Sequence, residues 1–310
     1  MTTIIRLVAL AGAMLLSLNA ISEDFPNRPI TMLIGFTAGG STDVQGQVLA
    51  EIMAEQLGQP VNVVHFPGQG SSLAAAMLAE SRDQGYVFQY GLSLPFVLTP
   101  LTSPTSYDYE SFRFVAGLTL HQSALVTAGD SLFASLEDLI EYARETGELS
   151  YATQTVQDRI LMEAIARQEG IRLNIVPTSG GSEMAPLVIS GEVALGYSGG
   201  THSGFTDSGE MRVLAALTRE RLADYPDVPT VSELGYPHDL HAFRVLVTPA
   251  DTPDHHIEIL ASAARAATRD ERFVAVAEDV TRMPVVYIPE PELDAVFEQQ
   301  VSEHEQMLRE

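Results

Sequence analysis

Residues 30–57 read ITMLIGFTAGGSTDVQGQVLAEIMAEQL, and this stretch decides the fold class. Ile30–Gly35 is a short apolar run, which is typical of a buried strand. Val44–Leu57 places apolar side chains on one helical stripe and stops before Gly58, which predicts an amphipathic helix. The turn between them, residues 35–43, is rich in Gly, Ser and Thr. A strand, a tight turn and a helix in this order indicate an α/β domain.

The same alternation of apolar runs and amphipathic segments continues along the chain. The predicted strands are Ile30–Gly35, Val61–Phe66, Tyr86–Tyr90, Ala124–Thr127, Leu149–Thr153, Asn174–Pro177, Val193–Tyr197, Val213–Leu217 and Phe243–Val247. The predicted helices are Val44–Leu57, Ser71–Glu80, Ser135–Gly147, Ile160–Gln168, Met184–Ile189, Pro253–Thr268 and Glu292–Leu308. Leu98–Tyr109, which is rich in Pro, is predicted to be a loop or crossover. The pattern predicts parallel sheets with helices on both faces, and in such folds ligands lie beyond the carboxyl ends of the strands.

The composition excludes several kinds of chemistry. Of 310 residues, 45% are hydrophobic and 19% are charged, which suits one large or two modest globular domains. The chain has 41 acidic and 17 basic residues and a formal net charge of −24, so it is a poor candidate for nucleic-acid binding. Every basic residue is Arg, which excludes lysine-based phosphate binding and Schiff-base chemistry. The sequence contains no Cys, which excludes a thiol nucleophile, a disulfide and a Cys-ligated metal.

The first 22 residues have the layout of a secretory signal peptide. Arg6 precedes the apolar run Leu7–Leu16, and Ala20 and Ser22 are small residues at the −3 and −1 positions of a cleavage site. We therefore expect cleavage near residue 22 and export of a soluble mature chain. An uncleaved membrane anchor is the alternative. No later segment has an apolar run long enough to cross a bilayer.

Glycine-rich turns that open helices are candidate anion sites, because the first N–H groups of a helix are unpaired and carry partial positive charge. The turn at residues 35–43 is not a P-loop, since the Lys of that motif is missing. Asp43 would repel an anion, so we expect it to serve the helix start instead. Similar turns follow at Pro67–Ser72, Thr153–Asp158 and Thr178–Ser182. Together they predict a site of neutral donors suited to a carboxylate, although each turn alone could be purely structural.

A serine hydrolase is the rival interpretation. Gly196–Gly200 reads GYSGG and matches the nucleophile-elbow pattern around Ser198. Such an elbow needs a helix directly behind the serine, whereas residues 201–207 are predicted to be a loop. The candidate bases are His202, His238 and His241.

The remaining charged and metal-binding candidates are few. His238–His241 and His255–His256 could ligate a metal, but no third ligand cluster accompanies them, so no metal site is expected. Arg159 and Arg244 could each clamp a carboxylate, or each could form a surface ion pair.

Three stretches, taken together, resemble one family. They are Phe25–Ile30 leading into residues 35–43, Leu57–Val61 followed by Pro67–Gly70, and Asp227–Gly235 with the sequence DVPTVSELG. These stretches resemble the extracytoplasmic solute-binding proteins of tripartite tricarboxylate transporters, the Bug family. The resemblance runs from about residue 25 to the C-terminus.

The resemblance implies a periplasmic location and a two-lobed periplasmic-binding-protein fold, with two doubly wound α/β domains, a hinge and a central ligand cleft. Domain I would comprise residues 23–125 and 243–310, and domain II residues 126–242. Such a receptor is a monomer and not an enzyme, needs no cofactor, and hands a small carboxylate to membrane permease subunits. The expected cargo is a dicarboxylate, a tricarboxylate or an aromatic carboxylate. A third class, the effector-sensing domain of a regulator, is disfavoured by the signal peptide and by the lack of a DNA-binding segment.

The resemblance also implies ligand-binding residues. The first loop would contribute Phe36, Thr37, Gly39, Gly40, Ser41, Thr42 and Asp43, and the turn after the third strand would contribute Ser93. The facing domain would contribute Thr153, Gln154, Thr155, Gln157, Thr178, Ser179, Gly180 and Gly181. This sequence departs from the family at Thr37, Ala38 and Ser41, where prolines and a third Gly are usual, and at Thr178-Ser179, where Tyr-Lys is common. Arg159 follows a turn that also departs from the family pattern, so it is a candidate partner for a distal carboxylate.

Overall fold

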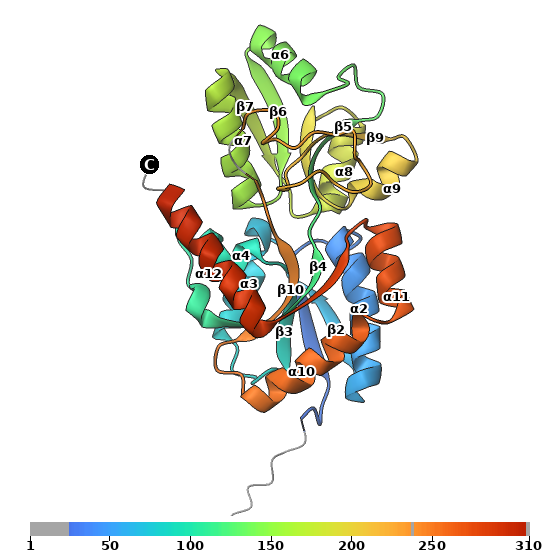
Figure 1. The fold of residues 1–310 in the computed structure, drawn as a ribbon, viewed down its shortest axis with the longest axis vertical. Helices are drawn as coiled ribbons and strands as arrows, with labels where there is room; N and C mark the ends of the chain where they lie inside the picture. Colours follow the sequence, from blue (N-terminus) through green and yellow to red (C-terminus); the bar gives the residue numbers. More distant parts are fainter. Residues whose placement is uncertain (1–24, 237–238, 308–310) are drawn as a thin grey trace, which may run out of the picture.

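The chain folds into two lobes that are stacked along the long axis of the molecule (Figure 1). The computed structural model describes residues 25–236 and 239–307, so the predicted signal peptide, His238 and Leu308 lie outside the described residues. Lobe I is built on a six-stranded sheet with the order β11-β4-β10-β3-β1-β2. Lobe II is built on a five-stranded sheet with the order β7-β6-β8-β5-β9.

Lobe I takes its elements from two distant parts of the chain. The first part contains β1 (Ile30–Ile34), α2 (Ser41–Leu57), β2 (Val61–His65), η1 (Gln69–Ser71), α3 (Ser72–Glu80), β3 (Val87–Leu92), α4 (Leu94–Val97), α5 (Thr99–Thr102), η2 (Tyr109–Ser111) and β4 (Phe112–Leu120). The second part contains β10 (Phe243–Pro249), α10 (Asp254–Ala267), α11 (Glu271–Val274), the π-helical turn η3 (Ala275–Val280), β11 (Val285–Pro289) and α12 (Glu290–Met307).

Lobe II is formed by the middle of the chain. Its elements are β5 (Ser123–Ala128), α6 (Leu136–Thr146), β6 (Glu148–Thr153), α7 (Val156–Glu169), β7 (Arg172–Pro177), α8 (Gly181–Ile189), β8 (Leu195–Gly199), α9 (His202–Asp207) and β9 (Met211–Ala216).

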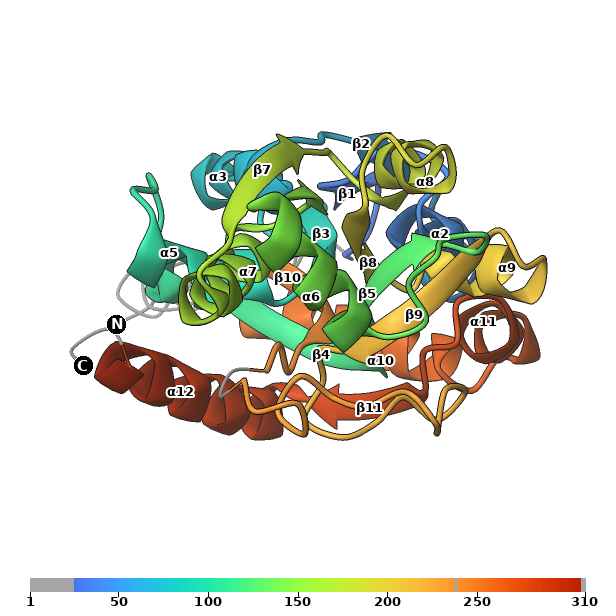
Figure 2. The same cartoon turned by 90° about the horizontal axis from the view of Figure 1, so that it is seen from above.

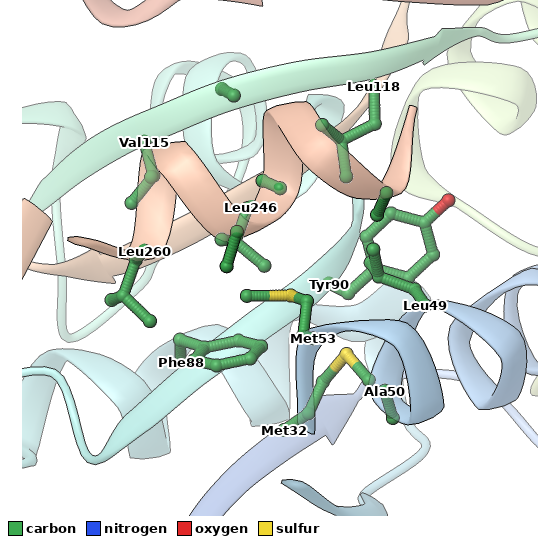
Figure 3. Packing of buried hydrophobic residues seen from close by; sticks show 14 of the residues in the cluster. Met32, Leu49, Ala50, Met53, Phe88, Tyr90, Val115, Leu118, Leu246 and Leu260 are labelled. Carbon is green, nitrogen blue, oxygen red and sulfur yellow. The ribbon is translucent and has the colours of Figure 1, made fainter. Parts of the chain in front are cut away.

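Helices cover both faces of each sheet, as the view from above also shows (Figure 2). In lobe I, α2 and α10 pack on one face, where Met53 and Leu260 meet Phe88 and Leu246 (Figure 3). On the other face, α3 and α12 pack their apolar side chains against the sheet. In lobe II, α6 and α7 cover one face and α8 covers the other. Burial of these apolar faces is what holds each sheet to its helices.

Both sheets are mixed, so the prediction of parallel sheets is correct only for the βαβ units. β1 pairs in parallel with β2 and β3, and β6 pairs in parallel with β7 and β8. β10 is antiparallel to β3 and β4, and β5 is antiparallel to β8 and β9. β11 is also antiparallel to β4. β5 and β10 each arrive from the opposite lobe and run against both of their neighbours, whereas β11 follows η3 within lobe I. Only His121 and Gln122 separate β4 from β5.

Each predicted strand is present within two residues of its expected ends. The elements that the sequence did not predict are β4, β11 and several short helices. The prediction of a loop over Leu98–Tyr109 is wrong in part, because α5 lies there with Pro100 in its first turn, where a missing N–H costs little. The loop predicted over residues 201–207 is wrong, because α9 occupies it. No helix of the described ranges is both long and apolar enough to span a membrane.

Candidate functional site

The turn between β1 and α2 lies at the interface of the two lobes. Gly40 is the N-cap residue of α2, and as a glycine it offers no side chain to cap this helix start. Asp43 points back into its own loop, where it accepts hydrogen bonds from the Gly39 N–H at 2.8 Å, from Gln47 and from His65. Burial alone would raise the pKa of Asp43, but these hydrogen bonds outweigh it and lower the pKa. Asp43 therefore shapes the loop, as expected for an acid at a helix start.

Hydrogen bonds join this turn directly to lobe II. The Ser41 N–H donates to Thr201 Oγ1 at 3.3 Å, and the Ser41 hydroxyl donates to the Gly199 carbonyl at 2.5 Å. The Thr37 N–H donates to the Ser179 carbonyl at 3.2 Å. Arg282 of lobe I also forms ion pairs with Asp207 and Asp224 of lobe II. The lobes are thus in direct contact.

A small cavity, here called the central cavity, lies between the lobes. Its volume is about 20 Å³, which is room for about one water molecule. Lobe I and lobe II line it with Phe36, Gly40, Ser41, Thr42, Leu92, His121, Gln154, Gly181, Tyr197, Gly199, Thr201 and Arg244. Six of these residues, Phe36, Gly40, Ser41, Thr42, Gln154 and Gly181, belong to the set that the resemblance implied.

Arg244 of β10 is the charged group of this cavity, and it is 1% exposed. Its Nη2 donates to Ser41 Oγ at 2.7 Å and to the Gly199 carbonyl at 3.2 Å. Its Nη1 donates to the Thr42 hydroxyl, and its Nε contacts Met283 Sδ at 3.1 Å. Among the described side chains, no carboxylate forms an ion pair with Arg244. The sequence left open a surface ion pair for this residue, and the structure excludes it.

The other titratable groups around Arg244 are neutral. Burial, together with the positive charge of Arg244, holds the pKa of His121 well below its usual value. Burial raises the pKa of Tyr90 to about 12 and also raises the pKa of Tyr197. The Nδ1 atom of His121 is buried and has no hydrogen-bond partner, while its Nε2 lies 3.1 Å from the Tyr197 hydroxyl.

A second, larger space, here called the side cavity, opens beside the central cavity, and Gln154 lines both. Its volume is about 190 Å³. Residues of both lobes line it, namely Gln69, Gly70, Thr153, Gln154, Thr155, Val156, Arg159, Pro177, Thr178 and Ser179. Arg159 stands on its wall with a half-exposed side chain, 3.8 Å from Glu163. The side cavity therefore gathers most of the lobe II residues that the resemblance implied.

Most hydrogen-bond donors in the turn before α7 already bond to an acceptor within lobe II. Asp158 is fully buried and accepts hydrogen bonds from the hydroxyls of Tyr151, Thr153 and Thr155. It also accepts from the backbone N–H groups of Gln154 and Thr155. This carboxylate caps α7, so the start of α7 offers fewer free donors than the start of α2.

The structure places the remaining implied residues outside both cavities. Thr37 bonds the turn before α8, Gly39 bonds Asp43, and Gly180 is the N-cap of α8. The Ser93 hydroxyl accepts a hydrogen bond from the Phe243 N–H. The Gln157 side chain donates across the lobes to Thr99 at 3.0 Å, while its Oε1 atom has no partner.

The geometry around Ser198 does not support a hydrolase. Ser198 and His202 are 0% and 1% exposed, so a substrate could not reach them. The Ser198 hydroxyl lies 2.9 Å from His202 Nδ1, but no carboxylate of the described residues orients that histidine. Burial lowers the pKa of His202 to about 4, which makes it a poor base at neutral pH.

Two of the other candidate histidines pack against aromatic rings. His241 meets the ring of Phe243 edge-on, and His256 of α10 stacks on Phe25. Within the described residues, no group of three His, Asp or Glu side chains is placed to hold a metal ion.

The residues that sequence reasoning missed come from the chain crossings and from β8. His121 lies where the chain passes between the lobes, and Tyr197, Gly199 and Thr201 lie at the end of β8. At the carboxyl end of β8, the sequence motif indicated only a possible nucleophile. The rule that ligands lie beyond the carboxyl ends of strands would have brought in Gly199 and Thr201.

Known proteins resemble the chain over most of its length. The model of the tripartite tricarboxylate transporter family receptor matches residues 46–310. A Cupriavidus necator protein, "UPF0065 protein in gbd 5'region", is 31% identical over 73% of this chain and 70% of its own. The protein BugT of Bordetella pertussis is 27% identical over 87% of this chain and 85% of its own.

Solved structures share the fold. The periplasmic binding protein BugD superposes with a TM-score of 0.81 at 22% identity, covering 92% of this chain and 98% of that one. The MatC protein of Rhodopseudomonas palustris, solved with malate, gives 0.80 at 22% identity, with 90% and 98% coverage. A second R. palustris protein, solved with adipate, gives 0.79 at 22% identity, with 92% and 98% coverage. The α/β fold of two lobes is therefore that of periplasmic binding proteins, and by its match to the family model this chain belongs to the tripartite tricarboxylate transporter receptor family, to which the Bug proteins are related.

Proposed function

We propose that this chain is an exported solute receptor that captures a small organic acid between its lobes. It delivers a dicarboxylate, a tricarboxylate or an aromatic carboxylate to the permease subunits of a tripartite transporter. The receptor acts in the periplasm as a monomer, after cleavage near residue 22, and without a cofactor or a catalytic step.

The observation that carries this proposal is the start of α2 in the central cavity, which lobe I itself leaves without a capping side chain. Gly40, Ser41 and Thr42 present a helix N-terminus there, and Gln154 and Gly181 of lobe II face it. A helix N-terminus stabilises an anion through its free N–H groups and its dipole. Relatives in the receptor family and neighbours solved with malate and with adipate support a carboxylate as that anion.

The proposal divides the binding work between the lobes. Residues 23–125 and 243–310 form the capturing domain, and residues 126–242 form the domain that selects among acids. The membership of the strands in the two sheets supports this division, except that β5 begins at Ser123 and already belongs to the sheet of lobe II. Opening of the lobes admits the ligand, because the central cavity is much smaller than any dicarboxylate.

A thermal-shift screen of the mature protein tests the proposal, since a ligand that binds only the folded state raises the melting temperature. The panel contains organic acids, sugars and cationic amino acids. We expect stabilisation by one or more acids, of about 2.7 kcal/mol at a concentration 100 times the dissociation constant. Stabilisation by sugars or cationic amino acids alone would contradict the proposal.

A further inference from the structure

Arg244 is a buried positive charge, and none of the described groups that it contacts carries a compensating negative charge. It lies in β10 at 1% exposure, and its partners are two hydroxyls, one carbonyl and one thioether. A guanidinium stays protonated in proteins, so it is a fully buried cation held by neutral groups. Buried charges are normally paired, because removal of a charge from water carries a large desolvation cost.

The arginine on the neighbouring strand is paired with carboxylates, as buried arginines normally are. Arg113 of β4 is less buried than Arg244, and it still pairs with Glu290 through Nε at 2.8 Å and with Asp254. Around Arg244, the described side chains supply no such acid. The two tyrosines that face it, Tyr90 and Tyr197, have raised pKa values and keep their protons.

The missing negative charge has a place to bind. Arg244 lines the central cavity together with the start of α2, which lobe I leaves without a capping side chain, so both favour an anion at the same point. His121 lines it too, and its Nδ1 atom is buried without a partner. The Ser41 hydroxyl and the Gly199 carbonyl, which now accept from Nη2, belong to different lobes, so opening of the lobes separates them.

We propose that Arg244 is the specificity-determining residue of the receptor, pairing its guanidinium with a carboxylate of the bound acid. When the lobes open, Nη2 loses its bond to Gly199, and a carboxylate oxygen takes that place. This pairing selects for a full negative charge and against the amide of the same shape. The inference rests on the proposed function and adds to it the group that distinguishes charged from uncharged ligands, the guanidinium of Arg244.

The rival explanation is that Arg244 only ties the lobes together. The first test uses the wild-type protein and isothermal titration calorimetry with malate, with adipate and with the diamide of adipate. We expect each acid that binds to do so at least about tenfold more tightly than the diamide, because hydrogen bonds to charged groups are the stronger kind. Equal affinities for adipate and its diamide would overturn the proposal without any variant.

The second test compares Arg244→Met with Arg113→Met. Arg244→Met should weaken binding of the acid by about 10- to 100-fold. It should leave the melting temperature of the unliganded protein unchanged or raised, because an unpaired buried charge is removed. Arg113→Met should instead lower the melting temperature of the unliganded protein and leave the affinity for the acid unchanged. An Arg244→Met protein that binds the acid as wild type does would show a structural tie and overturn the proposal.

The two proposals fail in different ways. The panel also includes small sulfonates and phosphonates as anionic probes. If only these bind the wild type, and Arg244→Met abolishes their binding, the carboxylate of the proposed function is wrong but the role of Arg244 stands. If no anion binds the wild type, both are wrong. If acids bind and Arg244→Met has no effect on their affinity, only the role of Arg244 is wrong.

Discussion

A substitution of Arg159 can test whether the ligand is long enough to extend from the central cavity into the side cavity. Arg159 stands on the wall of the side cavity, and Gln154 lines both that cavity and the central one. We therefore expect an acid of sufficient length to extend past Gln154 toward Arg159. The side chain is 46% exposed, so water screens its charge and limits its contribution.

We expect Arg159→Ala to weaken the binding of adipate more than that of hexanoate, its monocarboxylate analogue. The difference should be no more than about fivefold, as for exposed ion pairs. Calorimetric titration of both ligands provides the measurement, and Arg167→Ala, an exposed arginine farther along α7, is the control. Equal losses would place Arg159 outside recognition of the distal group, and no loss would make it a surface charge.

The difference between Arg159 and Arg244 shows what the sequence could reveal about the site. Both were recognised as arginines that could clamp a carboxylate, and the strand that carries Arg244 was predicted correctly. The burial of Arg244 depends on Ser41 and on Gly199, which are far away in sequence and belong to different lobes. Strand periodicity describes a residue's own sheet, so it carries no information about a facing lobe.

The helices and strands also differ in whether the sequence could predict them, and the reason is again whether their signals are local. Strands in βαβ units, such as β1 and β6, have their own turns and helices as local signals, and they were predicted. β4 was missed because it runs into β5 with two residues between them, so that one apolar stretch serves two sheets. α9 was missed because six residues that include Gly204 show too little helical periodicity. The turn between β8 and α9 is nonetheless the element through which lobe II contacts the start of α2.

Gly200 in this turn gives a test of closure. Its φ is +91°, and a Cβ atom there would lie 2.4 Å from Met283 Cε and 3.0 Å from the Thr281 carbonyl of lobe I. We expect Gly200→Ala to weaken ligand binding about tenfold or more, because overpacking costs about 1–3 kcal/mol and opposes closure. Gly209→Ala is the matched control, since its φ is +79° but its Cβ would meet nothing within 4 Å.

Both variants should lose stability to urea through the strained backbone, by about 1–2 kcal/mol. Only Gly200→Ala should lose affinity in calorimetric titration. Equal affinities for the two variants would show that the contact of Gly200 with lobe I has no part in binding.

The stability of the whole molecule should depend on pH through its buried histidines. Burial lowers the pKa of His202 from 6.5 to about 4, and it holds the pKa of His121 well below 6.5. Between these values the unfolded chain binds more protons than the folded one, so acid favours unfolding. The stability is fully present above pH 6.5 and is lost as the pH falls toward 4.

From pH 7.5 to pH 5.0, His202 alone should account for a loss of about 2 kcal/mol in the free energy of unfolding. Urea titrations at both pH values measure it. His202→Asn should reduce the loss by this amount, whereas His255→Asn, which replaces an exposed histidine of α10, should not. A wild-type protein equally stable at both pH values would show that His121 and His202 are not held neutral.

The direct contact between the lobes has a kinetic consequence. With room for about one water molecule in the central cavity, a ligand enters only after the cross-lobe hydrogen bonds of Ser41 and Thr37 have broken. In stopped-flow mixing, the observed rate should therefore rise with ligand concentration and then level off at the rate of opening. That ceiling is a property of the protein, so acids of different affinity would share it.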